Sequence, residues 1–251
     1  MPVKAQPPAS VTAWSWAGFY AGGSIGGRWA DNDWTAASLF PNFNVPPFVP
    51  FGPVTFTQVA AGSFDSSTLR FGGYVGYNWL VAPSWIVGIE ADLGWADSSK
   101  TANAVSASTV GGIGGITSIA VVTIRDTWDA GVRGRLGALV TPNSLVFGTA
   151  GVAWQRMQAS AFCPAFGGAT TFCTINHNES YSKTLTGWTA GAGLDQRLGD
   201  RWIARLEYRY ADFQRFSQLF FNSTGPFFDD RFTGNVKLRT HTLNAGLAYK
   251  F

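Results

Sequence analysis

The sequence has few charged residues and no long apolar run. Only 13% of its 251 residues are Asp, Glu, Lys or Arg, about half of the ~25% that is usual in a soluble domain. No segment approaches the ~20 consecutive apolar residues that a transmembrane helix needs. The net charge is +3, with Lys and Arg scattered singly, so the chain lacks the basic patch of a nucleic-acid-binding protein. We therefore expect neither a helical membrane protein nor a nucleic-acid partner.

Histidine is scarce as well, which limits catalysis and metal binding. The chain has two histidines, His177 and His241, and it has no nucleophile elbow and no cluster with metal-ligand spacing. Glu90 and Asp92 stand two residues apart, as paired catalytic carboxylates could, but arginines on neighbouring segments explain them more simply. We therefore expect a protein that is not an enzyme and that uses no metal or other cofactor.

The only cysteines, Cys163 and Cys173, have nine residues between them. A disulfide bond would stabilise this short loop by about 2–3 kcal/mol and would imply an oxidising compartment; two free thiols are the alternative. The first eight residues are polar and rich in proline, without the apolar core of a signal peptide. We expect that a leader was removed or that the start was assigned too late.

Glycine and aromatic residues, in contrast, are abundant, with 30 Gly, 20 Phe and 11 Trp. They lie in segments where apolar residues alternate with small or polar ones, the pattern of a β-strand with one apolar face. The last strand ends on Phe251 and needs a partner on both edges, which a closed barrel provides. The pattern occurs eight times, at residues 18–30, 69–80, 85–95, 127–139, 144–157, 186–198, 201–212 and 239–251.

The connections between these strands alternate in length. Short links follow the second, fourth and sixth strands, whereas segments of more than twenty residues follow the first, third, fifth and seventh. This sorting is typical of outer-membrane barrels. We predict an all-β fold: an eight-stranded antiparallel transmembrane up-and-down β-barrel with four long extracellular loops and short periplasmic turns. The barrel domain would span 17–251 and follow a flexible periplasmic arm, 1–16.

The charged residues of the strands fall on the polar face. An Arg or Lys that faces lipid at mid-bilayer costs about 2–4 kcal/mol, so a membrane barrel turns this face inward. Both signs occur on neighbouring strands, which predicts ion pairs in the lumen. They either fill the barrel or line a narrow charge-selective pathway, although eight strands leave little room for water. The predicted lumenal network comprises Glu90, Asp92, Asp129, Arg133, Arg135, Asp195, Arg197, Arg205, Glu207 and Arg209.

Tryptophan marks two levels on the apolar face, one near the short links and one near the long segments. Amphipathic rings are favoured at the two interfaces between lipid and water. In 144–157, however, Phe147 and Trp154 fall on opposite faces, which would fit a β-bulge. The predicted lipid-facing aromatic girdle comprises Trp29, Trp79, Trp85, Trp95, Trp128, Trp188 and Trp202.

Four motifs together resemble a known family. They are similar to the small porin-family outer-membrane β-barrel proteins of alphaproteobacteria, often called outer-membrane immunogenic proteins. The resemblance covers about 14–251 but not the long loops. It implies a surface antigen in the outer membrane of a Gram-negative cell, with Leu247, Tyr249 and Phe251 as the signal read by the barrel-assembly machinery. The motifs are Pro2-Val-Lys-Ala, Trp16-Ala-Gly-Phe-Tyr-Ala-Gly-Gly23, Leu206-Glu-Tyr-Arg-Tyr210 and Leu243-Asn-Ala-Gly-Leu-Ala-Tyr-Lys-Phe251.

Two functions fit these features. The first is a barrel that contributes to envelope integrity, with weak porin-like permeability as a further option and with outer-membrane lipid and lipopolysaccharide as partners. The second is surface binding or adhesion through the long loops, with haemin as a candidate ligand of His177 or His241. Alternatively, the strands continue beyond the membrane and the loop aromatics pack against one another. These aromatics are Phe40, Phe43, Phe48, Phe51, Phe56, Phe220, Phe221, Phe227, Phe228 and Phe232.

Overall fold

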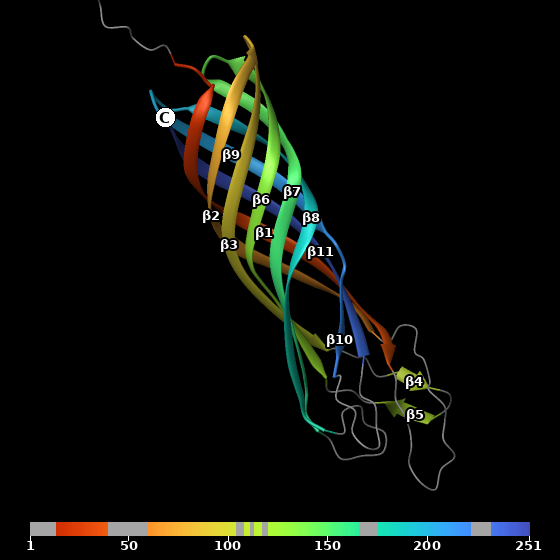
Figure 1. Ribbon diagram of the computed structural model, residues 1–251. Coiled ribbons are helices and arrows are strands. Elements are labelled where there is room, and N and C mark those ends of the chain that lie inside the picture. The colour runs from red at the N-terminus through yellow and green to blue at the C-terminus, as the bar shows by residue number, and fades with distance from the viewer. Residues whose placement is uncertain are drawn as a thin grey trace, which may run out of the picture.

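The computed structural model describes residues 14–39, 60–103, 108–110, 113–116, 120–165, 175–221 and 232–251. Within these residues, no helix is long and apolar enough to cross a membrane. The regular elements are strands, labelled in Figure 1. They are β1 (Gly18–Leu39), β2 (Ala60–Ala82), β3 (Trp85–Asn103), β4 (Ser108–Val110), β5 (Ile113–Ile116), β6 (Val121–Thr141), β7 (Ser144–Cys163), β8 (His177–Arg197), β9 (Trp202–Phe213), β10 (Phe216–Phe220) and β11 (Phe232–Lys250).

Eight of these strands close into an antiparallel barrel. Hydrogen bonds join them in the order β1-β2-β3-β6-β7-β8-β9-β11, and β11 pairs back onto β1. Consecutive long strands are neighbours in the barrel, so the connection is up-and-down (Figure 1). β10 follows β9 and pairs with β11 alone, and β4 pairs with β5. The predicted eight-stranded antiparallel fold is confirmed.

The barrel is apolar outside and charged inside. Along β3, Ile89 is 49% exposed, whereas Glu90 beside it is 1% exposed. Water-soluble folds show the opposite arrangement, because apolar side chains leave water and charged groups stay in it. Along β1, Phe19 and Ile25 likewise face outward and Tyr20 faces inward. The outer surface is therefore suited to an apolar medium.

Short turns join the strands at one end, as predicted. Two residues separate β2 from β3, and two separate β6 from β7. Trp16 packs against this end: it is 4% exposed, and its Nε1 donates a hydrogen bond to the carbonyl oxygen of Pro142 at 3.2 Å. Trp16 belongs to the segment 1–16 that we expected to be a flexible arm, and this packing fixes its last residues. Residues 1–13 lie outside the described residues, so flexibility there stays a prediction.

The strands run well past their predicted bounds at the opposite, long-loop end. β1 continues to Leu39 rather than ending at residue 30, and β11 begins at Phe232 rather than at residue 239. Pairs such as Asp31↔Arg239 extend the ladder. Charged outward side chains end the apolar alternation here, although backbone pairing continues. Much of what we predicted as long loops is therefore strand.

The prediction of a β-bulge in 144–157 is wrong. β7 pairs with β8 along its whole length without a register shift, and strict alternation accounts for inward Phe147 and outward Trp154. β6 is bulged instead, because its register with β7 shifts between Asp126 and Asp129. The extra residue lets both aspartates face the lumen.

The barrel divides into two leaves at the long-loop end. β2 pairs with β3 only as far as Phe71↔Trp95, and β8 pairs with β9 only as far as Gly187↔Phe213. Beyond these points β10, β11, β1 and β2 form one leaf, and β3, β6, β7 and β8 form the other. Figure 1 shows the β7–β8 and β10–β11 pairs diverging toward this end. We call this part the two-leaf extension.

An apolar core fills the space between the leaves. The β10–β11–β1 side contributes mainly aromatic rings, and the β6–β7–β8 side contributes mainly aliphatic chains. This packing closes the long-loop end of the lumen. Prominent members, each at most 3% exposed, are Trp34, Phe216, Phe220 and Phe232 from one leaf and Ile124, Met157 and Leu185 from the other.

Candidate functional site: a charged layer in the lumen

Charged side chains form one layer across the middle of the lumen. They come from six strands, because inward positions on neighbouring strands fall at the same height in an antiparallel barrel. Carboxylates and guanidiniums are interleaved, so each charge faces the opposite sign. We call this set the ionic layer; it comprises Arg28, Arg70, Glu90, Asp92, Asp129, Arg133, Arg135, Asp195, Arg205, Glu207 and Arg209.

The half of the ionic layer nearer the short turns is centred on Arg205. Its guanidinium contacts Glu90 (Nη1–Oε2, 2.5 Å) and Asp195 (Nε–Oδ1, 2.8 Å). Arg135 reaches Asp195 at 2.5 Å, and the Tyr20 hydroxyl donates a hydrogen bond to Glu90 at 2.8 Å. All five side chains are nearly fully buried. Burial without such partners would cost several kcal/mol per charge, on the order of the effective ionic desolvation penalty.

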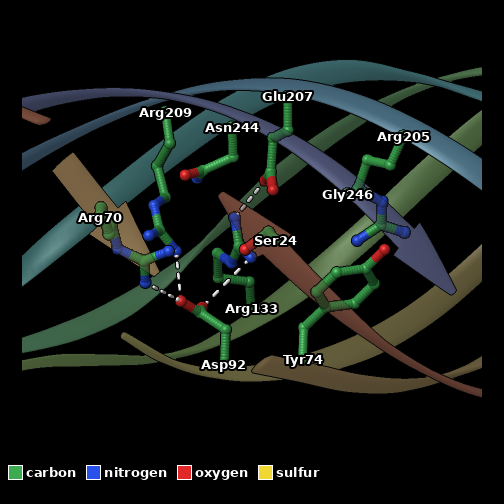
Figure 2. A pocket seen from close by; sticks show the side chains of 10 residues that line it. All are labelled: Ser24, Arg70, Tyr74, Asp92, Arg133, Arg205, Glu207, Arg209, Asn244 and Gly246. Carbon is green, nitrogen blue, oxygen red and sulfur yellow. Dashed lines mark hydrogen bonds and ion pairs between the residues drawn. The ribbon is translucent and has the colours of Figure 1, made fainter. Parts of the chain in front are cut away.

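The other half is centred on Asp92 and Asp129. Arg70 Nη2 lies 2.6 Å from Asp129 Oδ2 and 2.9 Å from Asp92 Oδ2. Arg209 Nη1 lies 2.7 Å from Asp92 Oδ2. Figure 2 shows both guanidiniums at one carboxylate oxygen of Asp92, with Arg133 at the other oxygen. Asp92 therefore has three cationic partners from three different strands.

Arg133 joins the two halves. Its Nη2 lies 2.7 Å from Glu90 Oε1 and 3.2 Å from Asp92 Oδ1, and its Nη1 donates to Glu207 (Figure 2). Its side chain is 1% exposed. The ionic layer is thus one continuous network, in which every carboxylate contacts at least one buried guanidinium.

One predicted network residue lies elsewhere. The Arg197 side chain is 27% exposed, pairs with Asp200 at 3.3 Å and lies over the Trp14 ring at 4.7 Å. It is the last residue of β8, so its side chain reaches the mouth of the barrel instead of the ionic layer. The other predicted residues all lie in the layer.

The prediction missed Arg28 and Arg70. Arg28 is a charged residue of the predicted strand 18–30 but is not in the predicted network, and its Nη1 lies 3.5 Å from Asp129 Oδ1. Arg70 stands beside outward-facing Phe71, and the same alternation turns it inward. Its position near the predicted strand start concealed this signal.

Apolar side chains seal the ionic layer on both sides. The two-leaf core lies beyond it at the long-loop end, and Trp16, Ile86, Leu145 and Ile203 lie beyond it at the short-turn end. Two cavities border the layer, with volumes of about 10 and 20 Å³. Each is about the size of one water molecule. The described lumen is therefore packed with side chains rather than open.

The predicted girdle residues face outward. Six of them are 45–56% exposed, and Trp128 is half-buried beside Trp95 in the register. Trp85 and Trp95 stand ten residues apart on β3. At about 3.3 Å per residue and a tilt of about 40°, this separation is roughly 25 Å, the height of the apolar band in outer-membrane barrels. The other five are Trp29, Trp79, Trp188, Trp202 and, at the same level as Trp95, Trp128.

The C-terminal strand presents its predicted signal on the outside. Leu247 is 45% exposed and Phe251 is 69% exposed. Tyr249 accepts a hydrogen bond from Arg201 at 2.6 Å.

At the long-loop end of the barrel, Cys163, the last residue of β7, takes part in a disulfide bond. Cys173, the only other cysteine of the sequence, lies outside the described residues, so their pairing stays a prediction.

The aromatic residues of the fourth long segment are not exposed for binding where they are described. Phe220, Phe221 and Phe232 are each 0% exposed, which supports the alternative that the strands continue and the aromatics there pack against one another. His177 is 3% exposed and stacks on Phe221 at 4.4 Å between ring centroids. Phe40, Phe43, Phe48, Phe51, Phe56, Phe227 and Phe228 lie outside the described residues.

His241 is the other imidazole, and it lies on the outer face. Its Nδ1 lies 2.7 Å from the Tyr208 hydroxyl, and its Nε2 lies 3.7 Å from Asp31. In the described ranges no three His, Cys, Asp or Glu side chains are grouped to hold a metal ion. The ionic layer consists of buried charges of opposite sign in contact with one another, and these contacts are electrostatic.

The profile of the outer membrane protein beta-barrel domain family matches residues 2–251. The chain belongs to this family. It is 30% identical over 250 residues to the 31 kDa outer-membrane immunogenic protein of Brucella melitensis, covering 99% of this chain and 89% of that protein. It is 31% identical over 165 residues to the 22 kDa outer membrane protein of Rhizobium leguminosarum, covering 65% and 62%.

Among solved structures, the fold is similar to that of the outer membrane protease OmpT from Escherichia coli. The TM-score is 0.52 over 93% of this chain and 96% of that one, at 12% identity. At this low identity, the similarity shows a shared fold and nothing about function. As a member of the family, the chain is a protein of the bacterial outer membrane, as predicted. In barrels of this kind the short turns face the periplasm and the longer loops lie outside the cell.

Proposed function

We propose that this outer-membrane barrel is closed and contributes to envelope integrity as a structural element, without enzyme activity and without a diffusion pathway. The supporting observation is the ionic layer, in which buried carboxylates and guanidiniums are joined in one network across the lumen. An ion that crossed it would have to separate buried pairs. Leaving one such charge unpaired costs about 3–5 kcal/mol.

The apolar clusters on either side support the same proposal. Water leaves narrow hydrophobic constrictions, and this dewetting closes a pore to ions. Here Trp16, Ile86 and Leu145 stand at the periplasmic side of the layer, and the two-leaf core stands at the extracellular side. Three barriers in series therefore oppose even weak porin-like permeability.

We also propose two kinds of partner. The outward apolar band suits membrane lipid and the acyl chains of lipopolysaccharide. The last strand, with Leu247, Tyr249 and Phe251 outward at its end, suits recognition by the barrel-assembly machinery. Surface binding through the long segments has less support, because the described aromatics there are buried and His177 is covered by Phe221.

The proposal is tested in a strain that lacks the gene, challenged with detergent or bile salts. We expect raised sensitivity, restored by the wild-type gene and by the control variant Arg125→Ala, whose ion pair with Asp97 is exposed. Arg205→Ala, which unbalances the ionic layer, should restore resistance poorly. Unchanged sensitivity of the deletion strain would contradict a role in envelope integrity.

A further inference from the structure

The two leaves meet at a seam between β8 and β10. β8 runs from His177 to Arg197, but its pairing with β9 ends at Gly187. β10 pairs with β11 and not with β8. A single backbone hydrogen bond, from Gln214 N to Thr186 O at 3.0 Å, marks the point where the ladder stops. Beyond it, residues 177–186 and β10 face each other without backbone pairing among the described residues.

Side chains bridge the far part of this seam. The Tyr181 and Phe220 rings lie edge to face, with centroids 5.4 Å apart. Glu179 accepts a hydrogen bond from the Phe221 backbone N–H at 2.7 Å, and this contact holds Phe221 at a φ of +61°. That left-handed conformation is uncommon for a residue other than glycine. This part of the seam is therefore fastened, even though its strands are not paired.

The near part of the seam is bordered by two cations. Lys183 occupies an inward position on β8, between Tyr181 and Leu185, yet it is exposed. Its Nζ lies 6.0 Å from the centroid of the Phe216 ring, across the seam. Arg215, in the break between β9 and β10, is also exposed. Neither forms an ion pair with a described carboxylate, whereas the cations of the ionic layer all do.

The seam begins at the extracellular edge of the apolar band. Trp188 and Tyr210, whose rings are 5.3 Å apart between centroids, lie directly below it on β8 and β9. Leu194 and Leu206 continue an exposed apolar path along the same two strands. Lys183 and Arg215, which have no ion pair within the described part of the chain, thus stand where lipid headgroups meet the barrel, and the apolar path stands where acyl chains do.

We propose that the β8–β10 seam binds one anionic lipid of the surrounding membrane. Lys183 and Arg215 hold its negatively charged headgroup, and its acyl chain lies along the outer face of β8 and β9 past Trp188. A charged headgroup satisfies two cations that have no described carboxylate partner, and charge-assisted hydrogen bonds of this kind are about twice as strong as neutral ones. This inference does not depend on whether the lumen conducts.

The test is native mass spectrometry of the full chain released from lipid nanodiscs. The discs contain zwitterionic phosphatidylcholine with a minority of phosphatidylglycerol as the anionic probe. We expect the wild-type protein to retain one phosphatidylglycerol. The double variant Lys183→Gln/Arg215→Gln should retain it about tenfold less, as expected when charge-assisted hydrogen bonds are lost.

The matched control is Arg125→Gln/Arg156→Gln, which removes the same charge from exposed positions on the neighbouring strands β6 and β7. Heat-modifiable migration shows that each variant is folded. Retention lost equally in both double variants would overturn the proposal in favour of general electrostatic attraction. Retention unchanged in Lys183→Gln/Arg215→Gln, or absent in the wild type, would also overturn it.

A second arm separates a lipid from a free anion. Glycerol phosphate carries a similar headgroup charge but has no acyl chain, and it is titrated into the detergent-refolded protein by calorimetry. We expect no measurable binding, because the apolar path past Trp188 contributes to holding the lipid. Binding of glycerol phosphate that matched phosphatidylglycerol would show a site for small anions and would overturn the proposal of a lipid site.

Discussion

At the scale of single residues, buried charge is the main determinant of this barrel. Arg205 has two carboxylate partners and lies over the Tyr74 ring at 4.4 Å. Its neighbours Glu90 and Asp195 are buried, at 1% and 2% exposed. Because a buried pair gains little over apolar packing but loses much when broken, such residues are expected to show large effects on removal.

Arg205→Ala should therefore lower the free energy of unfolding by about 3–5 kcal/mol, because it leaves Glu90 and Asp195 short of a cation. Urea titration of the protein in lipid vesicles, followed by tryptophan fluorescence, measures this. Arg125→Ala, which breaks an exposed pair with Asp97, should change stability by about 1 kcal/mol or less. Equal effects of the two variants would contradict the account.

Glycine allows the ionic layer to reach its partners across the lumen. A Cβ at Gly94 would overlap the guanidinium of Arg70, whereas a Cβ at Gly134 would have 3.8 Å to its nearest neighbour. Gly94→Ala should therefore destabilise the barrel by about 1–3 kcal/mol, the usual range for overpacking. The same urea titration compares it with Gly134→Ala, for which we expect no loss. A neutral Gly94→Ala would show that Arg70 can move freely.

Sequence alternation located most of the ionic layer but not its limits. Glu90 and Arg133 stand in the middle of clear alternating segments, so their inward direction was predictable. Arg197 and Arg70 stand at the ends of predicted strands, where alternation alone does not say whether a side chain reaches water. Which cation pairs with which carboxylate depends on the register between strands, which no single segment contains.

At the scale of strands, the apolar alternation marks the membrane and not the strand. β1 and β11 continue pairing to Leu39 and Phe232, past the level of Trp29. The sequence turns polar there because the outward side chains enter water, while the backbone hydrogen bonds stay in place. Strand ends were therefore predicted too early on the extracellular side, whereas the short turns, which end both pairing and alternation, were predicted correctly.

The last strand carries a prediction of its own. Phe251 packs its ring 5.4 Å from that of Phe19 and 5.2 Å from that of Tyr249. If it belongs to an assembly signal, deleting it should reduce the amount of folded barrel in the outer membrane several-fold. Heat-modifiable migration of membrane fractions measures this, with Leu198→Ala as a control at an exposed turn position.

Refolding in detergent separates assembly from stability for this variant. The purified chain without Phe251 should refold as well as the wild type, because the assembly machinery is absent. A refolding defect as large as the loss in cells would show that Phe251 acts through packing with Phe19, and the assembly proposal would be wrong.

At the scale of the whole molecule, the structure is a closed membrane barrel that continues outside as two packed leaves. The division was not predictable from the sequence, because it depends on where β2 leaves β3 and β8 leaves β9. The barrel class was predictable, since loop length, inward charge and the girdle all indicate it independently. The ionic layer and the two apolar clusters together predict that the lumen is closed, and this closure is the central claim.

Single-channel recording in a planar bilayer tests that claim most directly. The refolded wild-type protein is inserted, its fold is confirmed by heat-modifiable migration, and current is recorded at two salt concentrations. The account predicts a folded barrel that passes no discrete current at either concentration. Stable openings whose conductance rises with salt would show a wet lumen and would contradict the account, with Arg133, Arg205 and Glu90 then lining a pathway instead of filling it.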